Sequence, residues 1–365
     1  MAERRRQTST ATSTDVRRVL GVPDRLAVGI DIGGTKIAAG VVDEDGRVID
    51  RARRDTPTTD PDEVLEAIAD IVEEFRKDHI VKALGVGAAG FVDASASTVL
   101  FAPHLAWRNE PLRDRVARRT KLPVWVDNDA NATGWAEWRF GAAQNEADLV
   151  MITLGTGIGG ALVIDGQPYR GNFGIAGEFG HMQVVPHGRS CECGNSGCWE
   201  QYASGRVLER RARAAVDEGN RLGTLLAELA GGPELVTGAQ VTLAAQQGDD
   251  EAVEWLAEVG DWLGIGIANL AAALDPGVFV IGGGVSSAGL LLLDPARQAF
   301  SRSLTGRGYR AEARIVGAHL GPEAGMIGAA DMARLTARRR RPASPGARVR
   351  VPGAARSGRS RRPRR

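Results

Sequence analysis

From residue 26 onward, short apolar runs of strand length alternate with longer segments that carry apolar side chains at helical spacing. The runs at 26–30 and 37–42 are separated by a segment containing Gly33-Gly34-Thr35-Lys36, and this pattern predicts a hairpin. Residues 61–78 begin with Pro61 and acids and then place apolar residues three and four positions apart, which predicts a helix. Further segments of the same two kinds are the strand-like residues 83–88 and 124–126 and the mostly helical residues 203–229 and 240–273. Strands and helices mixed in this order predict a layered α/β or α+β fold.

One stretch of the chain recurs in outline about 120 residues later. Residues 26–41 and 149–163 each consist of an apolar run, a turn rich in glycine and threonine, and a second apolar run. Two such units predict two related domains that face one cleft, although two ordinary hairpins would leave the same pattern. We expect residues 26–140 to form the first domain and residues 141–319 the second, with a last helix at about 320–337 joining the first.

The two ends of the chain differ from its body in charge. Residues 1–25 hold six Arg and three acids, and residues 338–365 hold twelve Arg and no acid. Of the 46 basic and 45 acidic residues, 28 basic and 42 acidic ones remain in residues 26–337, which therefore carry −14 against +15 at the ends. Both ends are poor in apolar residues and are predicted to be disordered. An acidic body is typical of a soluble enzyme and disfavours nucleic acid as its ligand.

Several classes of protein are excluded by the sequence. Three cysteines cannot form the closed disulfide framework of a small secreted domain. The first residues contain no apolar run of signal-peptide length, and the longest apolar stretch, residues 263–274, is too short to span a membrane. A cytoplasmic protein without a membrane partner is therefore expected.

Three glycine-rich turns, at residues 31–36, 155–160 and 281–285, each follow a predicted strand. Glycine lets the backbone approach a phosphate group, whose oxygens accept hydrogen bonds from main-chain N–H groups and threonine hydroxyls. Asp31, at the end of its strand, is suited to hold a water molecule bound to magnesium. None of the turns matches a Walker loop, and each alone could be a structural turn. The three together predict a nucleotide cleft.

An asparagine and an aspartate emerge together from the strand that ends near residue 126. The amide of Asn128 is suited to bind a hydroxyl group, and the carboxylate of Asp129 is suited to remove its proton. Helix capping is the alternative, because Asp and Asn are favoured immediately before a helix.

All three cysteines of the chain lie close to a histidine in the sequence. His181, Cys191, Cys193 and Cys198 supply the ligands of a tetrahedral Cys₃His zinc site with a closed, structural coordination shell. His187 could take the place of His181, and inert buried cysteines are the alternative to a metal site. Glu178 and Glu200 flank this segment and are suited to accept hydrogen bonds from neighbouring hydroxyl groups, unless they are solvated surface residues.

Together these motifs resemble the sugar kinases of the ROK family, most of all actinobacterial members that act on glucose. The resemblance runs from about residue 26 to residue 337. The Cys-x-Cys-Gly-x-x-Gly-Cys-x-Glu run with its upstream Gly-Glu-x-Gly-His is the most specific part. The other matching segments are Asp31-Ile-Gly-Gly-Thr-Lys36, Asn128-Asp129-Ala-Asn131, Leu154–Gly160 and Gly282-Gly-Gly284.

The resemblance implies an actin-like ATPase fold, with two similar domains around a cleft and a zinc knuckle, and hexokinase-type chemistry. Asp129 is then the general base that takes the proton from the 6-hydroxyl of glucose, and that oxygen attacks the γ-phosphate of MgATP. The implied sugar-binding residues are Gly90, Asn109, Asn128, Asp129, Glu178, His181 and Glu200. The implied nucleotide-side residues are Asp31, Gly33, Gly34, Thr35, Lys36, Thr156, Gly157, Gly282 and Gly283.

The resemblance leaves several alternatives open. Mannose, an N-acetylhexosamine or fructose could replace glucose, and polyphosphate could replace ATP. A transcriptional repressor or a sugar-sensing module of the same family is a different class of function. Only about 25 residues precede the first hairpin, too few for a DNA-binding domain, and Asp129 is intact, so we expect an enzyme. The resemblance also implies a homo-oligomer, either a dimer or a tetramer.

Overall fold

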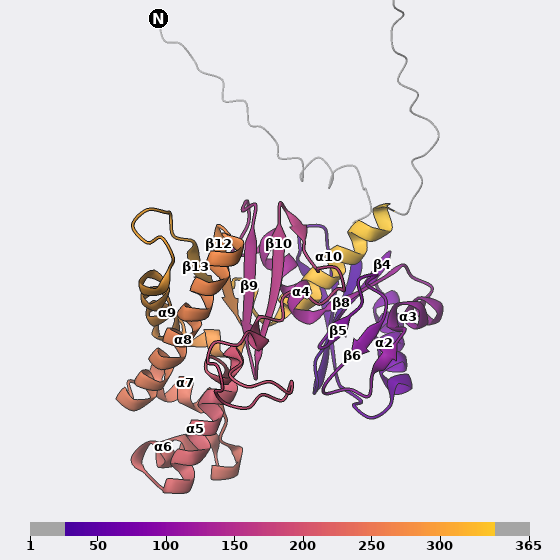
Figure 1. Ribbon diagram of the computed structural model, residues 1–365. Helices are drawn as coiled ribbons and strands as arrows, with labels where there is room; N and C mark the ends of the chain where they lie inside the picture. Colours follow the sequence, from indigo (N-terminus) through magenta and orange to yellow (C-terminus); the bar gives the residue numbers. More distant parts are fainter. Residues whose placement is uncertain (1–25, 340–365) are drawn as a thin grey trace, which may run out of the picture.

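The computed structural model describes residues 26–339, which form two five-stranded sheets with helices packed against them (Figure 1). The predicted disorder of residues 1–25 and 340–365 lies outside the described residues. Arg338 and Arg339, which the prediction assigned to the tail, belong to the last helix. No helix of the described part is long and apolar enough to cross a membrane.

The two sheets share one topology, in which an antiparallel hairpin is followed by parallel strands. In the order β3-β2-β1-β4-β8, the first sheet contains β3 (Val48–Asp55), β2 (Lys36–Val42), β1 (Ala27–Ile32), β4 (Ala83–Ala88) and β8 (Val124–Asn128). In the order β11-β10-β9-β12-β13, the second contains β11 (Gln167–Pro168), β10 (Ile158–Ile164), β9 (Leu149–Leu154), β12 (Val278–Gly282) and β13 (Arg314–Gly317). Hairpins β1–β2 and β9–β10 are the two recurring segments, so the prediction of two similar units is confirmed.

Helices and a small third sheet complete the described chain. The first half contains α2 (Pro61–Arg76), α3 (Leu112–Thr120), α4 (Asp129–Phe140) and a sheet of β5 (Phe91–Val92), β6 (Val99–Phe101) and β7 (Arg108–Glu110). The second half contains α5 (Gly205–Glu218), α6 (Arg221–Ala230), α7 (Gly238–Gln246), α8 (Asp250–Leu274) and α9 (Leu290–Ser303). Helix α10 (Ala324–Arg339) ends the described part.

The carboxyl ends of the central strands meet at one edge of each sheet. Parallel pairing places Asp31 of β1 opposite Gly87 of β4, and Gly87 opposite Asp127 of β8. In the second sheet, Thr153 of β9 lies opposite Gly282 of β12. Ligands of α/β sheets bind at such edges, so this register brings distant sequence motifs to one place.

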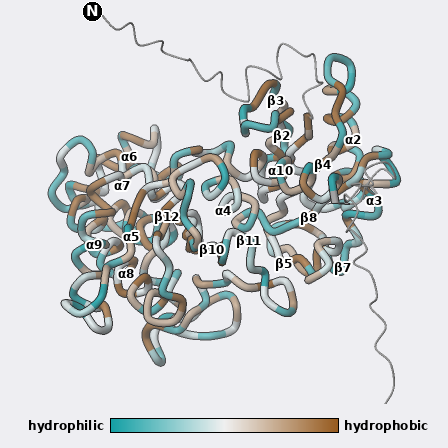
Figure 2. The backbone as a smooth tube through the Cα atoms, turned by 90° about the horizontal axis from the view of Figure 1, so that it is seen from above, coloured by the Kyte–Doolittle hydropathy of each residue, from teal (hydrophilic) through white to brown (hydrophobic). Residues whose placement is uncertain are grey.

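Helices α4 and α10 cross between the two sheets (Figures 1 and 2). Helix α10 packs so closely on β1 and β4 that only glycine fits at two positions of these strands. A side chain at Gly29 would collide with the backbone of Met326, and one at Gly85 with the backbone of Ala329. Gly328 of α10 meets the backbone of Ala132 of α4 in the same way. Helix α10 thus packs on the first sheet although it is the last helix of the described residues. The predicted domain boundaries at 140 and 320 stay predictions.

Candidate active site

A cleft of about 750 Å³ lies between the two sheets and is lined by residues from both halves of the molecule. Its volume is typical of a site for small molecules. The predicted site residues that line it are Asp31, Gly90, Asn128, Asp129, Thr156, Gly157, Glu178, His181, Cys193, Glu200 and Gly283.

Asn128 ends β8 and caps α4. Its side-chain oxygen accepts hydrogen bonds from the N–H groups of Ala130 (2.9 Å) and Asn131 (3.2 Å), and its side-chain nitrogen donates to the carbonyl of Gly90 (3.1 Å). Asn128 therefore caps helix α4, and this role does not exclude the predicted binding of a hydroxyl group by its side chain. The amide carries a second donor, and the Asn128 side chain also interacts with the carboxylate of Asp129.

Asp129 occupies the first turn of α4 and lines the cleft. Its carboxylate accepts a hydrogen bond from the N–H of Ala130 (2.9 Å). Burial raises the pKa of Asp129 above its ordinary value, although this hydrogen bond and the Asn128 side chain act in the opposite direction. A carboxylate with a raised pKa is a better proton acceptor near neutral pH than an ordinary aspartate.

Asp31 lines the cleft at the end of β1. Burial and the negative charge of Asp129 raise the pKa of Asp31 to about 7. Two carboxylates therefore share this part of the cleft, and each disfavours ionisation of the other. A divalent cation beside Asp31 would reverse that effect, because it stabilises the ionised carboxylate.

Asp127 anchors the segment that carries Asn128 and Asp129. One of its carboxylate oxygens accepts hydrogen bonds from the backbone N–H of Asn128 (2.8 Å), the side chain of Asn131 (3.0 Å) and the guanidinium of Arg170 (3.0 Å). Arg170 comes from the second half of the chain and also donates to the carbonyl of Asp93 (3.0 Å). This buried ion pair joins the two halves directly behind the candidate base.

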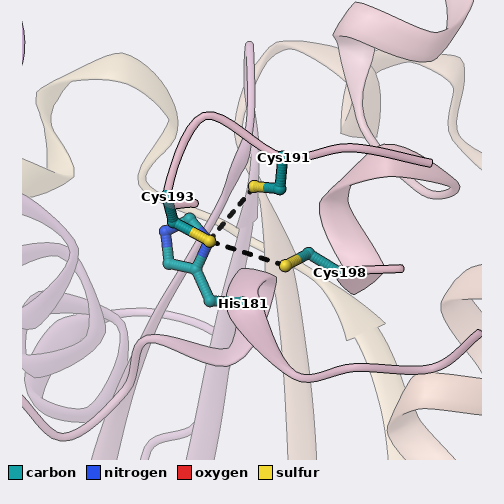
Figure 3. Close-up of side chains that lie close together, drawn as sticks. All are labelled: His181, Cys191, Cys193 and Cys198. Carbon is teal, nitrogen blue, oxygen red and sulfur yellow. Dashed lines mark hydrogen bonds between the residues drawn. The ribbon is translucent and has the colours of Figure 1, made fainter. Parts of the chain in front are cut away.

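The side chains of His181 and the three cysteines converge on one point, as Figure 3 shows, and His181 and Cys193 also line the cleft. Their ligand atoms all lie within 4.8 Å of one another; the Sγ atoms of Cys193 and Cys198 are 3.6 Å apart, and Nδ1 of His181 is 3.7 Å from Sγ of Cys191. Ligands of a tetrahedral zinc ion lie about 3.5–3.8 Å apart, so the donor set fits zinc. His187 is not part of this cluster.

The two glutamates lie on either side of the His181 ring. Oε2 of Glu178 is 4.0 Å from Nε2 of His181, and Oε1 of Glu200 is 3.8 Å from Nδ1. Glu200 also accepts a hydrogen bond from the thiol of Cys191 (3.2 Å). Burial and the charges of Asp129 and Glu200 raise the pKa of Glu178, while His181 lowers it. Both glutamates line the cleft and are not solvated surface residues.

The glycine turns of the second half form the other wall of the cleft. Gly283 has φ of 85°, and a side chain there would lie 2.5 Å from the carbonyl oxygen of Leu154, so only glycine fits. Gly157 lies against the carboxylate of Glu200. The N–H of Gly205, at the start of α5, donates to the carbonyl of Gly155 (2.9 Å), which fixes the turn against the helix.

Some of the predicted residues do not line the cleft. Lys36 is exposed on the far side of its turn, where its ammonium group pairs with Asp55 at 2.6 Å. Asn109 is exposed in β7. Gly34 packs against the side chain of His104, which does line the cleft. The ligand-binding roles of Gly33, Gly34, Thr35, Lys36, Asn109 and Gly282 stay predictions.

Several residues of the cleft were missed by the sequence analysis. Phe91, Phe101, His104, Thr133, Thr153, Glu192 and Arg206 all line it. Arg206 is the one Lys or Arg among the lining residues. Nothing in its local sequence marks it, whereas Glu192 lies between two cysteines of the metal cluster and could have been noted for that reason.

Known proteins with the same architecture were found by sequence and by structure. The chain is 48% identical to a glucokinase of Streptomyces coelicolor over 310 residues, which are 85% of this chain and 98% of the relative. A ROK family glucokinase from Streptomyces griseus, solved in complex with glucose and AMPPNP, superposes with a TM-score of 0.78 at 49% identity and covers 85% of this chain and 99% of its own.

A third similarity is to the ROK hexokinase of Thermus thermophilus, with a TM-score of 0.70, 34% identity, and coverage of 86% of this chain and 99% of that one. These likenesses confirm the predicted actin-like kinase fold. The sequence model described as "ROK family" matches residues 27–335, and the chain belongs to this family.

Proposed function

We propose that this protein transfers the γ-phosphoryl group of MgATP to the 6-hydroxyl of glucose, which yields glucose 6-phosphate and ADP. The observation that carries the proposal is the carboxylate of Asp129 in a cleft lined by hydroxyl-binding side chains and by glycine turns. The glucokinase relative is similar along 98% of its length.

In this mechanism Asn128 and Asp129 act on the same hydroxyl group. The side-chain amide of Asn128 donates to the hydroxyl oxygen when the sugar binds, and Asp129 accepts the hydroxyl proton as the oxygen attacks phosphorus in line with the departing ADP. The raised pKa of Asp129 helps this transfer, because the carboxylate holds the proton more tightly than an ordinary aspartate. Glu178, His181 and Glu200 hold the remaining hydroxyls and fix the orientation of the sugar.

The donor lies against the glycine turns in this proposal. Backbone N–H groups of Thr156, Gly157 and Gly283 would face the phosphates, whereas the N–H of Gly155 donates to the carbonyl of Gly157 (3.0 Å) within the turn. Asp31 would hold the magnesium ion through water. Magnesium, when bound with ATP, neutralises phosphate charge and the charge that develops on the leaving group. A cytoplasmic location, a homo-oligomeric state and the absence of a specific nucleic-acid partner stay predictions.

A panel of substrates tests the proposed function. We expect kcat/KM for glucose with MgATP to exceed that for mannose, N-acetylglucosamine and fructose by at least about tenfold, because fixed acceptors are left unpaired by a misplaced hydroxyl. Coupled detection of ADP measures each hexose, and inorganic polyphosphate replaces ATP in a parallel series. A tenfold preference for another hexose or for polyphosphate would contradict the assignment.

We further propose that the Cys₃His cluster holds one structural zinc ion. Four protein ligands close its coordination shell, so the ion positions His181 and the segment bearing Glu200 and has no direct role in the reaction. His181 would bind through Nδ1, which leaves Nε2 toward the sugar.

Metal analysis of a cysteine variant tests this site. The wild-type protein should contain about one zinc per chain, and Cys193→Ser should lose it and raise the KM for glucose by at least about tenfold, because His181 and the segment bearing Glu200 are then no longer held in place. Ser196→Ala, in the same loop but without a ligand atom, is the matched control and should keep its zinc. A metal-free wild-type protein with full activity would refute the proposal.

A further inference from the structure

An exposed ion pair joins Arg206 to Glu192 in the lining of the cleft. Nη1 of Arg206 lies 2.6 Å from Oε1 of Glu192, and both residues line the cleft. Glu192 stands between the metal-cluster residues Cys191 and Cys193, whereas Arg206 belongs to the first turn of α5. The side chains of Arg206 and Glu192 are 34% and 77% exposed, so the pair is open to solvent. Such exposed ion pairs are weak and readily exchange their partners.

Arg206 is fixed against a glycine turn by its backbone. Its N–H donates to the carbonyl of Thr156 (3.3 Å), next to the bond from Gly205 to Gly155 (2.9 Å). The base of the Arg206 side chain is therefore held beside the turn at 155–157, which is the wall that we assign to the phosphate chain. A guanidinium group at this place matches phosphate well, because its N–H groups donate in pairs to phosphate oxygens.

The cleft is rich in carboxyl groups, which favours a cation beside the bound nucleotide. Its lining includes five carboxylate side chains, namely Asp31, Asp129, Glu178, Glu192 and Glu200, and the single guanidinium of Arg206. A nucleotide triphosphate brings further negative charge into this space, and repulsion between like charges at short distance costs several kcal/mol. Magnesium offsets part of this repulsion, and Arg206 is the permanent cation available to offset more of it.

The field around Arg206 also favours an anion. Burial lowers the pKa of Arg210, one turn further along α5, and so do the positive charges of Arg189, Arg211 and Arg206. Arg189, Arg206 and Arg211 therefore lie near Arg210, although Arg206 is paired with Glu192 and Arg211 with Glu258. An anionic ligand near Arg206 would relieve that repulsion.

We propose that Arg206 binds the phosphate chain of the nucleotide donor and that Glu192 is its counterion in the free protein, displaced when the donor binds. This inference rests on the proposed kinase function and assigns two residues that the family motifs do not include. Glu192 then acts as a competitor for Arg206. A polyanionic phosphate chain displaces it, whereas a ligand without phosphates does not.

Binding of a non-hydrolysable ATP analogue with Mg²⁺, measured by calorimetry with and without glucose, tests the proposal. Arg206→Gln should weaken binding about 10- to 100-fold, the range expected for loss of a charge-assisted hydrogen bond. Arg206→Lys should recover part of the loss, and Glu192→Gln should tighten binding about two- to fivefold. The Kd for glucose should change less than twofold in all three variants.

Arg213→Gln is the matched control, because Arg213 lies on the same helix in an exposed pair with Glu209 (2.8 Å) and does not line the cleft. Zinc content and melting temperature show whether each variant is folded. If Arg206→Gln does not fold, the nucleotide affinities of Arg206→Lys and Glu192→Gln test the proposal in its place. The inference is overturned if Arg206→Gln binds the MgATP analogue as tightly as Arg213→Gln does, or if Glu192→Gln binds it more weakly than the wild type. Either result leaves the proposed kinase function intact. A wild-type protein that binds no MgATP analogue overturns the kinase function as well.

Discussion

Replacing Asp129 with asparagine should lower kcat for glucose phosphorylation by about 10²–10⁴-fold, the range that loss of a general base produces. The asparagine keeps the size of the side chain and cannot accept the proton of the 6-hydroxyl as its carboxylate does. Glucose affinity should change by less than about threefold, because Asn128, Glu178 and Glu200 remain. A coupled assay measures kcat, and calorimetry measures the Kd for glucose.

The exposed Asp114 supplies the control for this experiment, since Asp114→Asn makes the same chemical change in a surface pair with Arg113. Its kcat should equal that of the wild type. If Asp129→Asn retained more than a tenth of the wild-type kcat, Asp129 would not be the base. If it lost glucose binding in parallel, its role would be in holding the sugar.

Substitution of Glu137 should lower the free energy of unfolding by a large amount. Its side chain is fully buried, and its carboxylate accepts hydrogen bonds from the N–H groups of Ala142 (2.8 Å), His319 (2.9 Å) and Leu320 (2.8 Å). It thus ties the end of α4 to the segment before α10, at the crossing between the two sheets. Glu137→Ala should lower the free energy of unfolding by about 3–5 kcal/mol, because three N–H groups lose their acceptor.

Urea unfolding followed by far-ultraviolet circular dichroism measures this change. Glu137→Gln should recover only part of the loss, because its amide nitrogen cannot accept hydrogen bonds. Glu66→Gln, which removes a charge from an exposed pair with Arg119 (2.9 Å), should cost about 1 kcal/mol or less. Equal midpoints for the Glu137 and Glu66 variants would show that the network carries little stability.

The parts of the fold that could be predicted are those whose pattern is local. The hairpins β1–β2 and β9–β10 combine apolar runs with glycine turns, and α2 has a proline start and an apolar stripe. Strand β3 could not be recognised, because its sequence VIDRARRD is mostly polar and its strand character comes from pairing with β2. The short strands β5, β6 and β7 are likewise defined by their partners.

In the candidate active site, too, the residues that could be predicted are those in local sequence motifs. Asp129, Glu178 and the metal cluster stand in compact motifs, and the register of the sheets brings these motifs together. Arg206 and Arg170 carry no local signal, since each matters through a partner distant in the sequence: Thr156 for Arg206, and Asp127 for Arg170. Of residues 31–36, only Asp31 lines the cleft, and the roles of the other residues of this turn in nucleotide binding stay predictions.

The central claim is that Asp129 deprotonates the 6-hydroxyl of glucose in this cleft. Phosphorus NMR of a mixture of protein, glucose and MgATP tests it most directly, because the product resonance identifies which hydroxyl has been phosphorylated. We expect glucose 6-phosphate to accumulate with the wild-type protein and to form at least about a hundredfold more slowly with Asp129→Asn. Phosphorylation at another hydroxyl, or glucose 6-phosphate formed by both proteins at the same rate, would contradict the account.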